Sequence, residues 1–267
     1  MGLGGLSLVI TTPLLLCFSI SYRLLIISFF VAFSSYQINR NTDVTEDQVS
    51  YSKRVEFINT NSRILNIISL VFYICAMIFA FSTKILLGLI ILFPPLIVIL
   101  YSTKMLPSLI NNRLKDIFLI KNFTTAFTWS FVTTALPVVY FSQANLNLSV
   151  LIVFSFVFFK VFLNNITFDI RDIEGDSKKG IDTLPVKLGV SKTKALLTFL
   201  NLCSFLIIII PTFFQILPPK AYTISLIVVY TQFYIFFLDR TTAPFLYDLI
   251  ADGEWIVMAI LAIVGHL

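Results

Sequence analysis

Two groups of polar residues are spaced so that each would lie along one face of a helix. In the first group, Asn39, Asp43 and Asp47 form an NxxxDxxxD pattern. Positions four apart in an α-helix differ by only about 40° around the axis, so these three side chains form one stripe if the segment is helical. The first group therefore predicts a row of oxygen ligands on one side of a helix.

The second group consists of Asn165, Asp169, Asp172 and Asp176, with spacings of four, three and four residues. If a single helix continues through all four positions, their side chains fall within an arc of about 60°. This prediction depends on the helix extending past the apolar run that precedes it.

Several carboxylates gathered in one place repel one another unless a cation lies between them. Ligands that are all oxygen favour a hard cation, and Mg2+ binds through a few carboxylates together with waters and phosphate oxygens. The two groups together predict a site for a Mg2+-bound diphosphate, for which two ions are the natural number. Two solvated acidic helix ends are the alternative, and calcium is disfavoured because no EF-hand pattern is present.

The elements that position these residues are predicted to be membrane-spanning helices. Hydrophobic residues make up 58% of the 267 residues, charged residues 12%, and the mean hydropathy is +0.94. This is too much apolar surface for one soluble core to bury, so the chain is predicted to be an all-α polytopic membrane protein. Residues 1–267 are expected to form one domain with about nine spans. These spans are predicted at 3–20, 22–39, 63–82, 84–101, 121–141, 147–168, 193–215, 219–238 and 244–265.

The charged residues predict how the chain is oriented in the membrane. Fifteen of the 19 Lys and Arg residues fall in the connections that follow the second, fourth, sixth and eighth spans. Basic residues concentrate in cytoplasmic loops, so the N-terminus is predicted inside and the C-terminus outside. All 14 acidic residues lie in or near the same connections, which the basic-residue rule does not require and a cytoplasmic binding site would explain. The net charge of +5 is read as affinity for anionic lipids and substrates, and no nucleic acid partner is expected.

The two groups resemble the motifs of the UbiA superfamily of intramembrane prenyltransferases. The first group matches the NxxxDxxxD motif of that family, and residues 168–189, FDIRDIEGDSKKGIDTLPVKLG, resemble its second Asp-rich motif. The resemblance implies nine helices around a central cavity that is open to the lipid, with both motifs on the cytoplasmic side.

The resemblance also implies roles for individual residues. The carboxylates of the two motifs are the expected catalytic group, namely Asp43, Asp47, Asp172 and Asp176, and Asp169 joins these four as an expected Mg2+ ligand. A Tyr- and Lys-containing motif of the family is similar to Tyr101 to Lys104, although the lysine stands one position early. The residues expected to bind diphosphate or substrate are Asn39, Arg54, Tyr101, Lys104, Asn165, Lys178 and Lys179.

The activity implied is transfer of a prenyl group from a prenyl diphosphate to a lipophilic or aromatic acceptor, with release of diphosphate. A terpene cyclase that uses the same site without an acceptor is an alternative, and a transporter is another, although acids near one membrane face argue against it. Two assignments stay open. Lys160, inside the sixth span, is either functional or directed back to the membrane surface. A basic group that includes Lys121 either covers the site or faces lipid.

Overall fold

The computed structural model describes residues 2–42, 52–102, 117–141, 147–178, 180–239 and 241–266. Within these ranges the chain is helical and contains no strand, which confirms the predicted all-α class. The helices of the first half are α1 (Gly2–Leu15), α2 (Tyr22–Thr42), α4 (Ser52–Phe81), α5 (Ile85–Ser102) and α6 (Ile120–Tyr140). Those of the second half are α7 (Leu148–Lys178), α8 (Leu184–Leu188), α9 (Val190–Phe213), α10 (Ala221–Ser225), α11 (Ile227–Phe237), α12 (Pro244–Ile250) and α13 (Gly253–Val264).

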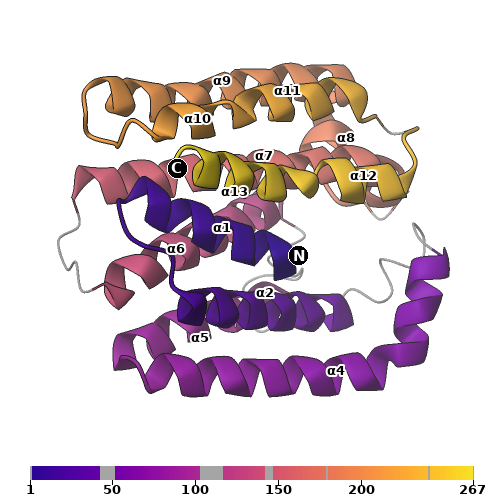
Figure 1. Cartoon of the computed structure of the whole chain (residues 1–267). Helices are drawn as coiled ribbons and strands as arrows, with labels where there is room; N and C mark the ends of the chain where they lie inside the picture. Colours follow the sequence, from indigo (N-terminus) through magenta and orange to yellow (C-terminus); the bar gives the residue numbers. More distant parts are fainter. Residues whose placement is uncertain are drawn as a thin grey trace.

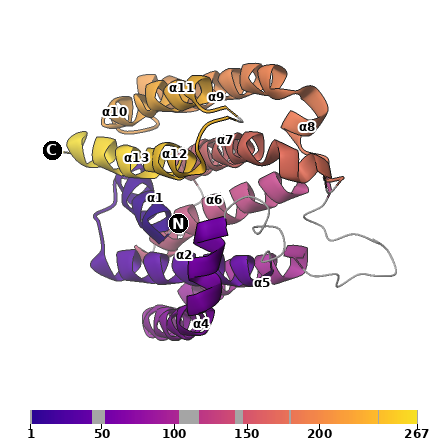
Figure 2. The same ribbon diagram turned by 90° about the vertical axis from the view of Figure 1, so that its right-hand side faces the viewer.

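The long helices lie side by side in layers (Figures 1 and 2). Helices α2, α4 and α5 pack together on one side of the molecule, and α7, α9, α11 and α13 pack together on the other. Helices α1 and α6 lie between these groups and contact both, with α6 packed most extensively along α7. The second acidic group is therefore carried by a helix that belongs to the centre of the bundle.

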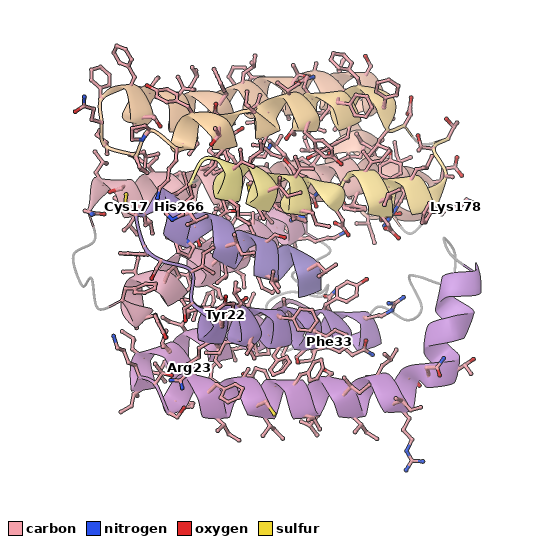
Figure 3. All side chains as sticks on the ribbon, in the orientation of Figure 1. Cys17, Tyr22, Arg23, Phe33, Lys178 and His266 are labelled. Carbon is pink, nitrogen blue, oxygen red and sulfur yellow. The ribbon has the colours of Figure 1, made fainter. Side chains whose placement is uncertain are left out.

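The two motif-bearing helices end on the same side of the molecule. Helices α2 and α7 both run from left to right in Figure 1, so their C-terminal ends lie at the right, as do α8 and α12. Figure 3 shows Lys178, the last residue of α7, at this end, whereas Cys17 and His266 lie at the opposite end. We call the right-hand end in Figure 1 the site end.

The outer helices expose apolar side chains, as expected for contact with lipid. On α4, Ile64 and Leu70 are 59% and 61% exposed, and α9 carries Phe199, which is 61% exposed. Three helical segments in the described ranges are long and apolar enough to cross a membrane: Thr60–Phe81, Leu148–Lys178 and Val190–Phe213. These segments support an integral membrane protein, whereas the count of nine spans and the central cavity stay predictions.

Several helices end or break where the sequence alone predicts a continuous span. Helix α1 stops at Leu15, because Cys17 adopts a left-handed backbone with φ of 61°. The last predicted span is divided into α12 and α13 around Ala251. The carbonyls of Ile250 and Ala251 accept hydrogen bonds from the side chains of Tyr230 and Asn164, at 2.8 and 2.9 Å. Neighbouring helices thus satisfy backbone groups at the break, which an apolar environment requires.

Candidate active site

Helix α7 carries the whole second group on one uninterrupted helix. It runs for 31 residues from Leu148 to Lys178, ten residues beyond the end of the predicted span. The continuation that the one-face arrangement requires is therefore present, and Asn165, Asp169, Asp172 and Asp176 share one side of α7. The helix ends at Lys178, and the φ of 69° at Gly180 allows the Ile181 amide to donate to the Asp176 carbonyl at 2.9 Å. This is the hydrogen bond of a Schellman C-cap.

Asp169 lies deepest in the group and is held from α6. Its side chain is only 2% exposed. The Asn122 side-chain nitrogen donates to Oδ2 of Asp169 at 2.6 Å, and the Lys121 ammonium lies 3.4 Å from Oδ1. A buried carboxylate needs such partners because burial removes its hydration. Asp169 therefore fixes the start of α6 against α7.

Asp172 and Asp176 lie further toward the site end and are half-buried. The guanidinium of Arg171 donates to both oxygens of Asp172 at 2.8 Å, and it also lies 3.3 Å from Asp248 of α12. The same guanidinium stacks on the ring of Phe168, 4.8 Å from its centroid. Asp172 therefore already has a cation beside it, which is the arrangement expected for a carboxylate among other negative charges.

Asn165 presents an unsatisfied polar atom on the same side of α7. Its side-chain nitrogen is buried and has no hydrogen-bond partner among the residues that the structure describes. The side-chain oxygen of Asn122, next to Asp169, is also buried and is likewise without a partner in those ranges. Unpaired buried polar atoms are rare in folded proteins, and a bound ligand is one reason for them.

Much of the first group lies outside the described residues. Asn39 is half-buried near the end of α2, but Asp43 and Asp47 belong to the undescribed stretch 43–51, and Lys104 and Lys179 are also outside the description. Arg54 and Tyr101 are placed only as positions within α4 and α5. Within the described ranges, no three His, Cys, Asp or Glu side chains form a group that could hold a metal ion. Whether the two groups meet therefore stays a prediction, as do the roles assigned to these residues.

Lys178 ends α7 with an exposed side chain. It lies at the site end, two residues beyond Asp176 (Figure 3). Its role as a diphosphate ligand stays a prediction.

The environment of Lys160 excludes one of the two alternatives suggested by the sequence. Its side chain is 0% exposed, so it does not reach the membrane surface. Its ammonium lies 2.5 Å from Oε1 of Glu254, itself 0% exposed, and donates to Thr231. Glu254 also accepts hydrogen bonds from Thr231 at 2.5 Å and from Tyr234 at 2.7 Å. These residues join α7, α11 and α13 through one buried polar network.

Sequence reasoning missed Asn122 and the burial of Glu254, and it left Lys121 undecided. Asn122 is a single amide near the start of an apolar run, and no pattern distinguishes it. Glu254 lies close to three other acids, which made a solvated loop the expected setting. The sequence did contain evidence for their contact, because Lys160 and Glu254 carry opposite charges and both lie inside predicted membrane spans, where charged residues usually pair.

Comparison with known proteins agrees with this architecture. The sequence pattern of the UbiA prenyltransferase family matches residues 3–264. A UbiA homolog from Archaeoglobus fulgidus, solved with GPP and Mg2+, is 18% identical with a TM-score of 0.70, covering 99% of this chain and 94% of that one. The apo structure of a UbiA homolog from Aeropyrum pernix K1 is 13% identical with a TM-score of 0.72, covering 100% and 98%.

A digeranylgeranylglyceryl phosphate synthase also shares the fold, at 20% identity and a TM-score of 0.59, covering 99% of this chain and 92% of that one. No curated protein matches in sequence. The match to the family pattern covers nearly the whole chain, and the solved structures share its fold across their length. The chain therefore belongs to the UbiA prenyltransferase family and is a prenyltransferase.

Proposed function

We propose that this enzyme transfers a prenyl group from a prenyl diphosphate to a lipophilic or aromatic acceptor within the membrane, with Mg2+ as cofactor. The observation that carries the proposal is the uninterrupted helix α7, which places Asn165, Asp169, Asp172 and Asp176 on one side at the site end. Helix α2, with Asn39 near its C-terminus, ends on the same side (Figure 1). Family membership favours an enzyme over a transporter.

The polar atoms on α7 fit a metal-bound diphosphate. Asp172 and Asp176 supply carboxylate oxygens, which Mg2+ prefers, and the buried nitrogen of Asn165 can donate to a phosphate oxygen. We propose Asp43, Asp47, Asp172 and Asp176 as the metal ligands, in keeping with two ions. The solved relatives from A. fulgidus bind GPP or DMAPP together with Mg2+, which supports this choice of donor and metal. When bound, Mg2+ neutralises the charge that develops on the departing diphosphate.

The residues of the chain would act on the donor in three ways. Five residues are proposed to contact the diphosphate and hold it at the membrane boundary: Lys178, Lys179, Arg54, Lys104 and Tyr101. Cleavage of the bond between the allylic carbon and oxygen leaves its electron pair on diphosphate. Aromatic side chains around the resulting cation can stabilise it by roughly 0.5–2 kcal/mol each and exclude water. The acceptor then forms the new bond to carbon and gives up a proton.

The membrane setting follows from the same arrangement. The prenyl tail is proposed to lie among apolar side chains in contact with membrane lipids, while the diphosphate faces the cytoplasm and the N-terminus is inside. Basic residues in the even connections support this orientation. Aromatic acids, quinone precursors, glycerophosphate-type lipids and polyenes are all compatible with one diphosphate site, so the acceptor class must come from experiment.

The decisive experiment uses the purified protein in lipid with Mg2+ and a panel of prenyl diphosphates of different length, each with and without candidate acceptors. Release of diphosphate that depends on an acceptor supports transfer, whereas an acyclic donor converted to a cyclic product without acceptor would establish the cyclase alternative. Asp43→Ala, Asp172→Ala and Asp176→Ala are each expected to abolish turnover. Arg23→Ala is the control, because this arginine donates to Thr83 at the end of the molecule opposite the site end (Figure 3). Near-normal Mg2+-dependent activity in the first three variants would reject the proposed site.

A further inference from the structure

Lys121 and Asp169 contact each other but differ in solvent exposure, which suggests that the two residues have separate roles. The carboxylate of Asp169 is almost fully buried, whereas the Lys121 side chain is 49% exposed. The two are 48 residues apart in the sequence and join the start of α6 to the middle of the acidic group on α7. One end of the pair is therefore fixed in the protein, and the other remains accessible.

Asp169 already has partners at both of its oxygens. Oδ2 accepts the 2.6 Å hydrogen bond from Asn122, and Oδ1 faces the Lys121 ammonium. A metal ion at this carboxylate would have to enter a buried position beside the Lys121 ammonium, because the Asp169 side chain is only 2% exposed. Asp172 and Asp176, which are half-buried, are more accessible ligands on the same helix.

The ammonium of Lys121 retains donor capacity for a further ligand. An ammonium group has three N–H donors, of which the contact with Asp169 needs one. The negative charges of Asp172 and Asp176 also attract this group, so it lies within the electrostatic influence of the proposed metal ligands. A cation in this position would meet the phosphate oxygens of a substrate held by those ligands.

We propose that Lys121 binds the diphosphate of the prenyl donor directly, and that Asp169 is a positioning residue that orients Lys121 and does not bind Mg2+. The inference rests on the proposed function, and it departs from the sequence-based expectation that Asp169 is a metal ligand. Lysine suits this role because its ammonium acts as a compact point charge toward phosphate. The buried Asp169 limits the positions that this flexible side chain can adopt.

The test measures binding of inorganic pyrophosphate to the purified protein by titration calorimetry at several Mg2+ concentrations. Lys121→Met is expected to weaken pyrophosphate binding roughly tenfold or more, as loss of a charge-assisted hydrogen bond predicts. Lys121→Arg should restore most of the affinity, because it keeps the charge. Lys220→Met is the matched control, since this lysine contacts His266 at the end of the molecule opposite the site end.

The dependence of pyrophosphate binding on Mg2+ concentration distinguishes a carboxylate that orients Lys121 from one that binds the metal. Asp169→Asn should weaken pyrophosphate binding but leave the Mg2+ concentration for half-maximal binding unchanged, whereas Asp172→Asn should raise that concentration or abolish binding. Unchanged pyrophosphate affinity in Lys121→Met would overturn the inference, and so would an Asp169→Asn variant that behaves like Asp172→Asn. Because the Lys121 side chain is half exposed, Lys121→Met decides the question even if Asp169→Asn does not fold.

Failure of this inference is distinguishable from failure of the proposed function. If the wild-type protein binds pyrophosphate with Mg2+ but forms no prenylated or cyclised product, the proposed reaction is wrong and the binding data still judge Lys121. If the wild-type protein does not bind pyrophosphate at any Mg2+ concentration, the inference is rejected, and product formation alone judges the proposed reaction.

Discussion

The buried pair of Lys160 and Glu254 offers a sharp test of how the bundle is held together. Replacing Glu254 with Gln leaves the Lys160 ammonium in the interior without a counter-charge. Replacing Lys160 with Met leaves the carboxylate with hydrogen bonds from Thr231 and Tyr234 and no cation beside it among the described residues. Both single variants should therefore be strongly destabilised. The double variant, Lys160→Met with Glu254→Gln, should recover much of the loss because no isolated charge remains.

The magnitude follows from the complete burial of both side chains. Removing one partner of a buried ion pair costs about 3–5 kcal/mol, whereas replacing both partners with uncharged groups is often close to neutral. For a chain of this size each kcal/mol lowers the unfolding midpoint by about 2–4 °C. The single variants should therefore lose roughly 6–20 °C, with the larger effect in Glu254→Gln, where the ammonium loses its only charged partner within the described residues.

The assay is thermal unfolding of the purified variants in one detergent, followed by intrinsic fluorescence and by loss of the monodisperse elution peak. Lys194→Met provides a control in which the lysine of a looser pair, at 3.9 Å, is removed, and we expect a shift of no more than about 2–4 °C, since a more exposed pair contributes roughly 1 kcal/mol or less. A double variant that loses as much as the sum of the two singles would refute the reasoning, because the two charges would then act independently.

Three further predictions concern the site end of α7. Removal of divalent cations with EDTA should abolish product formation in the wild-type protein, and added Mg2+ should restore it, as measured by diphosphate release; activity that survives EDTA would exclude the metal. Asn165→Leu should leave the unfolding midpoint unchanged or higher, because it removes an unsatisfied buried nitrogen, while it weakens pyrophosphate binding by roughly tenfold. Gly180→Ala should cost about 1–2 kcal/mol in thermal unfolding, since φ is 69° there. Apart from its neighbours in the chain, no described residue has an atom within 4 Å of the added methyl group, so a much larger loss would show that steric contact also contributes.

Helix α7 shows what the spacing of residues in the sequence can and cannot predict about their arrangement in the structure. The 4-3-4 spacing predicts a common face only if the helix passes its apolar segment, and α7 does continue to Lys178. The end of the helix is also readable in the sequence, because Gly180 provides the left-handed residue that a C-cap requires. The breaks at Leu15 and around Ala251 were not predicted, since apolar composition alone does not show where side chains such as those of Tyr230 and Asn164 satisfy backbone carbonyls.

The sequence by itself determined the helical membrane class and the common face of the second acidic group, and it predicted the chemistry of the ligand, because composition, periodicity and charge are properties of short segments. Only the tertiary structure decided which distant residues meet. Asn122 donates to Asp169, which is 47 residues away in the sequence, and Lys160 donates to Thr231, which is 71 residues away. Such contacts depend on how helices pack, and packing depends on the shapes of many side chains at once. Asp169 is an example: the sequence motif predicts that it binds a metal, whereas the packing of α6 against α7 places its carboxylate beside Lys121.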